Sequence, residues 1–165
     1  MENIESTSSI ETVGLGIHWE DLPVGRRFRT VGRTITEADL VNFISATGML
    51  EVLFTNTEFI KHEAPIKGRL LPAALLYCYA EGLLTQSTMQ RVGFAFLNME
   101  LDVKAPSFVN DTVHVVCEVI ESRPSKSRPG LALVRTRNEV VNQKNETVLV
   151  YTPLRMLKGK NYVIS

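Results

Sequence analysis

An uncharged run of apolar residues is the strongest feature of the hydropathy pattern. The stretch 69–86 reads RLLPAALLYCYAEGLLTQ, and residues 70–80 within it include no charged side chain. Apolar side chains fall on every face when this stretch is placed on a helix, which is typical of a helix buried on all sides. Pro72 suits the first helical turn, where a missing N–H costs no hydrogen bond. The pattern therefore predicts a buried central helix over residues 72–85.

Helix signals also precede this central helix. Thr36 and Asp39 approximate a capping box, and Gly48 is a natural C-terminal stop, so we expect a helix between them. A short apolar run at 49–55 follows, and Asn56 is placed to cap a second short helix. Ahead of Thr36, β-rich alternation predicts one or two short strands.

After residue 90 the pattern changes to the period of β-strands. Alternation over 92–103 reverses its phase at residues 96–97, which predicts a β-bulge there. Three further stretches are expected to be strands: 112–120, 131–141 and 147–157. Pro153 places a bulge or a sheet edge in the last of them. Helices followed by a meander of antiparallel strands indicate an α+β fold, with roughly five or six strands curled around the central helix.

Composition fits one globular domain without a nucleic-acid partner. We assign residues 1–17, rich in Ser, Thr and Glu, to an N-terminal tail, and 18–165 to a single domain. The 18 Lys and Arg balance the 18 Asp and Glu, whereas nucleic-acid binding would need a basic surplus. A net charge of zero gives little mutual repulsion, which favours an oligomer. Cys78 and Cys117 lie in apolar runs, so we expect buried free thiols in a reducing compartment.

We expect no membrane partner and a cytoplasmic location. The uncharged run at 70–80 is far shorter than the roughly 20 residues that a membrane-spanning helix needs. The N-terminus has neither the positive start nor the apolar block of a secretory signal.

Five segments, in order, resemble the MaoC-like dehydratase family, the (R)-specific enoyl-CoA hydratases of the hotdog fold. They are WEDLPVGRRF, TITEADLVNFISATG, FTNTEFIKHEAPIKGRLL, LDVKAPSFVNDTVHVVCEVIESRPSKSRPG and VVNQKNETVL. The likeness covers residues 19–157. It implies a curled antiparallel β-sheet wrapped around the central helix, and subunits that pair into a continuous sheet with substrate between them.

The resemblance also implies a reaction, the addition of water across a trans-2-enoyl thioester. In the family an aspartate and a histidine activate the water, while backbone N–H at the helix start holds the thioester oxygen. The implied partner is an acyl-CoA thioester, with coenzyme A as part of the substrate and no other cofactor. The implied assembly is a homodimer or a higher homo-oligomer.

This sequence lacks the family's pair of proton carriers. The family motif reads Gly-Asp-x-Asn-Pro-x-His-x-Asp, and the equivalent stretch starting at Gly48 has Met49 for the aspartate and Phe54 for the histidine. Neither side chain can carry a proton. Pro72 and Ala73 replace the His-Gly pair at the helix start, and only Ala73 retains an N–H. A positioned acid or base contributes a factor of about 10²–10⁴ in rate, so we do not assign the family's catalytic pair to this chain. The resemblance is used only to predict where the substrate pocket lies.

The candidate site residues form two groups. Those expected to bind substrate are Met49, Phe54, Asn56, Leu71, Pro72 and Ala73. Glu51 and His62 are the candidates for a substitute acid or base. Within its apolar run Glu51 would have a raised pKa, or it is a charge at the dimer interface. His62 is alternatively a solvated surface residue, and Asn56 a helix cap.

Three functions stay open on this sequence. The first is a variant hydratase or dehydratase that uses Glu51 or His62. The second is a catalytically inactive subunit that binds an acyl thioester or a partner, and the third is a hotdog thioesterase. Glu81 is expected to pair with an arginine of the sheet or to reach the dimer interface. The basic turn at 123–128 either meets the phosphates of coenzyme A or is a solvated loop.

Overall fold

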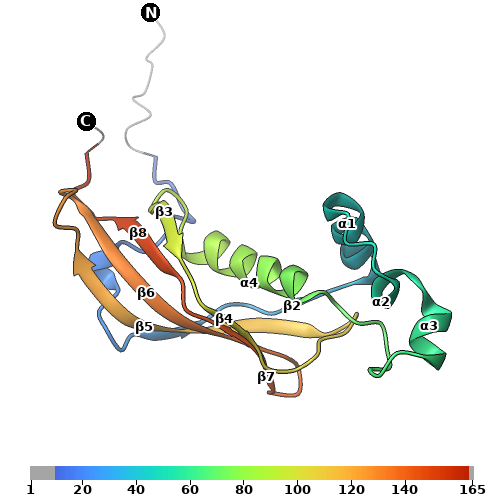
Figure 1. Ribbon diagram of the computed structural model, residues 1–165. Helices are drawn as coiled ribbons and strands as arrows, with labels where there is room; N and C mark the ends of the chain where they lie inside the picture. The colour runs from blue at the N-terminus through green and yellow to red at the C-terminus, as the bar shows by residue number, and fades with distance from the viewer. Residues whose placement is uncertain (1–9, 164–165) are drawn as a thin grey trace, which may run out of the picture.

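The computed structural model describes residues 10–163, which form one curled antiparallel sheet with a long helix along one face (Figure 1). The helical elements are η2 (Trp19–Asp21), α1 (Glu37–Thr47), α2 (Val52–Thr55), α3 (Thr57–His62) and α4 (Ala73–Thr88). The strands are β1 (Arg27–Arg29), β2 (Arg33–Thr34), β3 (Gly93–Asn98), β4 (Leu101–Val103), β5 (Thr112–Pro124), β6 (Leu131–Val141), β7 (Thr147–Tyr151) and β8 (Leu154–Lys158). In Figure 1 the helices α1, α2 and α3 gather beyond the N-terminal end of α4.

The long strands β5 and β6 form the middle of the sheet. The order of neighbours is β1-β5-β6-β7-β4, while β2 also pairs with β5 and β8 pairs with both β6 and β3. Pro153 separates β7 from β8, as its missing N–H predicts. The register of β3 against β8 shifts between Phe96 and Asn98, which confirms the irregularity expected at 96–97. Because of these interruptions the sheet has 8 strands rather than five or six.

Helix α4 supplies the centre of the main core. Leu75, Leu76, Ala80 and Leu84 are buried, and they belong to one cluster with apolar residues of β5, β6 and β7. The predicted central helix is therefore confirmed, beginning one residue later, with Pro72 as its N-cap. Each Å² of apolar surface removed from water contributes about 25 cal/mol, so this helix–sheet contact stabilises the fold.

Burial of α4 on all sides was the wrong expectation. Ala74, Cys78 and Gly82, spaced four residues apart, form an exposed stripe on the helix. The reason is that the sheet of a single chain covers one side of the helix. Of the two thiols expected to be buried, Cys117 is buried and Cys78 is exposed, and both are free in the described part of the chain.

The caps of the short helices follow local sequence rules. Thr36 Oγ1 accepts the Asp39 N–H at 3.3 Å, and Asp39 Oδ2 accepts the Thr36 N–H at 2.8 Å, which completes the predicted capping box. Gly48 ends α1 with φ of 71°, a left-handed conformation that suits glycine. Asn56 caps α3, as predicted.

Residues 16–17 are hydrogen-bonded to the end of α4. Residues 1–9 of the expected tail lie outside the described residues. Gly16 N–H and Ile17 N–H donate to the carbonyls of Gln90 and Thr88, at 2.9 and 2.7 Å. Ile17 also packs on a second, smaller core cluster around Val119 and Val134. Within residues 10–163, none of the helices combines the length and apolar character needed to cross a bilayer.

Candidate functional site

A pocket of about 430 Å³ lies at the N-terminal end of α4. Four residues expected at the substrate site line it together: Phe54 from α2, and Leu71, Pro72 and Ala73 from the helix start. The loop between β4 and β5 forms the other wall. These four residues thus share one pocket at the end of the helix where the sequence predicts the substrate site.

The start of α4 presents backbone donors to this pocket. Pro72 is the N-cap and, among the described residues, has no side-chain hydrogen bond to the helix. The N–H groups of residues 73–75 precede the first intrahelical donor, Leu76, which bonds to the Pro72 carbonyl at 3.2 Å. These N–H groups and the positive end of the helix dipole favour a negatively polarised oxygen.

Arg69 holds the Phe54 wall of the pocket in place. Its guanidinium donates to both carboxylate oxygens of Glu37 in α1, with Nε at 2.9 and 3.0 Å and Nη2 at 2.6 Å. The same guanidinium donates to the Phe54 carbonyl at the end of α2. One side chain thus connects the start of α1, the end of α2 and the approach to α4.

The candidate acid and base do not reach the pocket. Glu51 is exposed, and its carboxylate caps α2 by accepting the Leu53 N–H at 2.8 Å, so its expected apolar environment was wrong. The side chain of His62 is 73% exposed, and its Nε2 lies 3.5 Å from Glu58 on α3. Among the described residues that line the pocket there is no carboxylate and no imidazole; Lys104 is the one ionisable side chain.

Two expected substrate contacts also lie outside the lining. Asn56 Oδ1 accepts hydrogen bonds from the N–H groups of Glu58 and Phe59 at 3.1 and 3.0 Å. Asn56 thus acts as a helix cap, the second of the two roles expected for it. Met49 is exposed in the link between α1 and α2. Met49 is also absent from the residues that line the pocket.

Sequence reasoning missed the wall contributed by residues 103–107. Ser107 lines the pocket and is 4% exposed, yet its Oγ has no hydrogen-bond partner among residues 10–163. The Leu71 N–H donates to the Ser107 carbonyl at 2.9 Å, and this bond joins the loop to the approach to α4. The only signal in the sequence was that these residues belong to a segment that resembles the family. Their contact with Leu71 joins positions more than 30 residues apart, which sequence patterns do not reveal.

Comparisons with known proteins return matches among solved structures. A MaoC-like dehydratase from Rhodospirillum rubrum has a TM-score of 0.79 at 24% identity, over 89% of this chain and 100% of the other. An R-hydratase from Pseudomonas aeruginosa matches with a TM-score of 0.74 at 20% sequence identity, over 91% of this chain and 93% of the other. A Mycobacterium tuberculosis protein described as having a double hotdog fold matches with a TM-score of 0.80 at 22% sequence identity, over 94% of this chain and 48% of the other. No family model and no curated protein matches the chain.

The chain has a hotdog fold. The resemblance expected from the five sequence segments is thereby confirmed at the level of the fold, with α4 as the hotdog helix and the curled sheet around it. The pocket at the start of the hotdog helix is the candidate functional site.

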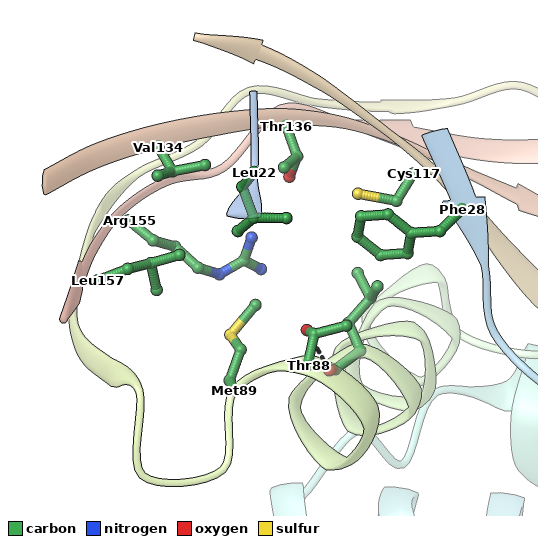
Figure 2. Close-up of a pocket in the computed structure, with 10 residues that line it drawn as sticks. Leu22, Phe28, Thr88, Met89, Cys117, Val134, Thr136, Arg155 and Leu157 are labelled. Atoms are coloured by element: carbon green, nitrogen blue, oxygen red, sulfur yellow. Dashed lines mark hydrogen bonds between the residues drawn. The ribbon is translucent and has the colours of Figure 1, made fainter. Parts of the chain in front are cut away.

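A second cavity lies at the other end of the hotdog helix (Figure 2). Since the 16 residues of α4 extend roughly 24 Å, the two sites are well separated. Figure 2 shows the Arg155 guanidinium pointing into this cavity, among Leu22, Met89 and Phe28. Its volume of about 20 Å³ admits one water molecule and no larger ligand.

Arg155 in this cavity pairs with Glu81 of the hotdog helix. The guanidinium lies 2.5 Å from Glu81 Oε1, and the same oxygen accepts the Tyr151 hydroxyl at 2.8 Å. Glu81 therefore pairs with an arginine of the sheet, one of its two expected roles. Burial and the nearby Glu81 charge strongly raise the pKa of Tyr151. Tyr151 thus remains a protonated donor to this ion pair.

The basic turn at 123–128 lies far from the pocket of its own chain. It begins in the last two residues of β5, whereas the pocket wall at Ser107 precedes the start of that strand. The 13 residues of β5 extend roughly 40 Å. Within one chain this turn and the pocket are therefore too far apart for the turn to contact the phosphates of a ligand seated there.

Proposed function

We propose that this hotdog protein binds an acyl-CoA thioester in the pocket at the start of α4, without hydrating it by the aspartate and histidine used in the MaoC-like family. One observation carries the proposal. The pocket pairs an apolar lining with the N–H groups of a long helix, and the described residues that line it include no carboxylate or imidazole.

The chemistry of an acyl thioester fits these features. A pocket of about 430 Å³ is within the usual range for small-molecule sites, and Phe54, Leu71 and Leu76 offer apolar surface to an acyl chain. The helix N–H groups are suited to the thioester carbonyl oxygen. Coenzyme A belongs to this proposal as part of the ligand.

Hydration would need a group that removes a proton from water. Lys104 lies in an ion pair with Asp102, with Nζ and Oδ2 3.2 Å apart, and a charged ammonium is a donor without acceptor capacity. Glu51 and His62 lie outside the pocket lining. Binding without turnover therefore has more support than the variant hydratase or the thioesterase.

The proposal is tested by titrating the full chain with saturated and trans-2-enoyl-CoA thioesters in a calorimeter. We expect binding of both classes, and at least tenfold weaker binding by Phe54→Asp, because the new carboxylate is desolvated by the ligand. Val24→Asp is the matched control, since Val24 is exposed in a turn beside β1 and outside the pocket lining.

Absorbance of the enoyl thioester and release of free thiol are recorded in the same samples. We expect both to stay constant. Loss of the conjugated absorbance would identify a hydratase, and thiol release a thioesterase. If no acyl-CoA binds to the unaltered protein, the proposal is wrong.

We further propose that the protein forms a homodimer through the edge made by β3 and β4. Within the described chain these strands pair on one side only, with β8 and β7. Their exposed apolar side chains are Phe94, Phe96, Leu97, Leu101 and Val103. An exposed apolar strand edge is a template for pairing with a second copy. Val103 also lines the pocket, so a second copy at this edge would border the acyl site.

A cytoplasmic location remains part of this proposal. Both cysteines are free in the described chain, which fits a reducing compartment.

A further inference from the structure

The basic turn at 123–128 lies at one end of the exposed edge made by β3 and β4. Its Lys126 and Arg128 are exposed, and the Arg128 guanidinium carbon lies 5.5 Å from the centre of the Phe94 ring at the start of β3. In the described part of the chain, the ion pair of this turn belongs to Arg123, so neither of these two cations has a carboxylate partner. The turn therefore has two cations that are available to an anionic ligand.

The acyl pocket lies at the opposite end of the same edge. Val103, the last residue of β4, lines the pocket. Strands β3 and β4 run in succession along β8 and β7, so the edge is continuous from Gly93 to Val103. Ten residue steps of strand extend roughly 33 Å, which keeps the turn far from the pocket of its own chain.

The exposed apolar side chains of the edge include two pairs that are equally far from its middle. Antiparallel pairing with a second copy about a two-fold axis there places Phe94 opposite the partner's Val103. The same axis places Phe96 opposite the partner's Leu101, and a symmetric dimer needs such a self-complementary surface. Since paired strands lie about 4.8 Å apart, the partner's Phe94, with the partner's Arg128 against its ring, then borders the Val103 wall of the acyl pocket.

We propose that the phosphates of a bound acyl-CoA are held by Lys126 and Arg128 of the partner subunit, so that a complete site takes its pocket and its basic turn from different chains. This inference rests on the proposed function and on the proposed dimer. The phosphates lie a pantetheine arm away from the thioester, so the cations that hold them must lie beyond the acyl pocket. Lysine and arginine form strong charge-assisted hydrogen bonds with phosphate oxygens.

Mixed dimers test whether the turn acts on the pocket of the other chain. The pocket variant is Phe54→Asp, and the turn variant is Lys126→Gln together with Arg128→Gln. We expect each variant alone to bind butyryl-CoA at least tenfold more weakly than the unaltered chain. A mixed dimer, co-expressed with two affinity tags, should regain one site of unaltered affinity, because the intact pocket of one chain meets the intact turn of the other. Absence of that site overturns the inference.

A ligand without phosphates separates phosphate contacts from effects on the pocket. S-butyryl-pantetheine keeps the thioester and the arm of butyryl-CoA, and we expect the unaltered chain to bind it at least tenfold more weakly. The turn variant should lose most of this preference. Arg27→Gln together with Arg29→Gln removes two exposed charges from β1, which pairs with β5 away from the β3–β4 edge, and should change neither affinity. Lys126→Gln alone leaves Arg128 against Phe94, and should weaken butyryl-CoA binding about threefold in a protein that remains dimeric.

Unchanged butyryl-CoA affinity in the turn variant overturns this inference and leaves the proposed binding of acyl-CoA intact. A monomeric unaltered protein that still binds butyryl-CoA has the same consequence. If the unaltered chain binds neither thioester, the proposed function is wrong as well.

Discussion

Asp39 shows how one side chain serves both a local and a distant structural role. Its carboxylate closes the capping box of α1 and also accepts the Tyr79 hydroxyl of α4 at 2.5 Å. Arg33 lies over the Tyr79 ring and 3.4 Å from the carboxylate. The Tyr79 hydrogen bond, followed by that from the Thr36 N–H, lowers the pKa of Asp39. Burial and the Asp39 bond raise the pKa of Tyr79 to about 12.

We expect Tyr79→Phe to destabilise the protein by about 1–2 kcal/mol at pH 7, because a hydrogen bond to a charged group is lost. The folded protein holds the pKa of Asp39 below its unfolded value of about 3.9, so this stabilisation is present above that pH and is lost as the pH falls through the folded pKa. Urea unfolding at pH 7 and at pH 3 gives the free energy of unfolding of the unaltered protein and of Tyr79→Phe. An equal difference at the two pH values would contradict the linkage to Asp39.

At the scale of elements, α2 is the piece that depends most on its surroundings. Its 4 residues are too few to form a stable helix in isolation. Glu51 caps its start, and Arg69 bonds to the Phe54 carbonyl at its end. The position of Phe54 in the pocket wall is therefore set by contacts from outside the helix.

Replacing Arg69 by Met keeps an apolar stem and removes the guanidinium. The Glu37 carboxylate is half exposed, so we expect a loss of about 1 kcal/mol in stability, together with weaker acyl-CoA binding as the Phe54 wall loosens. Hydrogen exchange of the amides in α2 should accelerate more than that of α4. Arg29→Met, an exposed arginine on β1, is the control. Unchanged exchange in α2 would show that Arg69 does not hold this wall.

At the scale of the molecule, the β3–β4 edge and the exposed stripe of α4 are the surfaces that a single chain leaves uncovered. Ala74, Cys78 and Gly82 lie on that stripe, and the strand edge carries large apolar side chains. A net charge of zero adds little repulsion between copies. Both features are consistent with the proposed pairing of two chains.

We expect the protein to sediment at twice the mass of its 18.5 kDa chain, and Leu97→Lys to sediment as a monomer. Leu97 is 46% exposed on β3, and a lysine there would place a charge in an apolar contact. Val24→Lys, at an exposed residue away from this edge, should remain dimeric. A monomeric unaltered protein, or a dimeric Leu97→Lys variant, would contradict pairing through this edge.

Local signals in the sequence were enough to predict most of the secondary structure. The capping box at Thr36, the stop at Gly48, the cap at Asn56 and the interruption at Pro153 each act within a few residues. Such effects depend on backbone geometry and short hydrogen bonds, so they are visible without the fold. The apolar run of α4 likewise identified the helix at the centre of the core, and the resemblance placed a pocket at its start.

Only the tertiary structure decided which side chains share the pocket. In the folded chain Glu51 caps a helix, and Met49 and His62 lie at the surface. Ser107 lies beside the start of α4 and lines the pocket. The fold also exposes Cys78, because the sheet covers one side of the helix. These outcomes depend on contacts between segments tens of residues apart. The sequence itself determined the local elements, because their signals act within a few residues; packing between those elements determined which groups face a ligand.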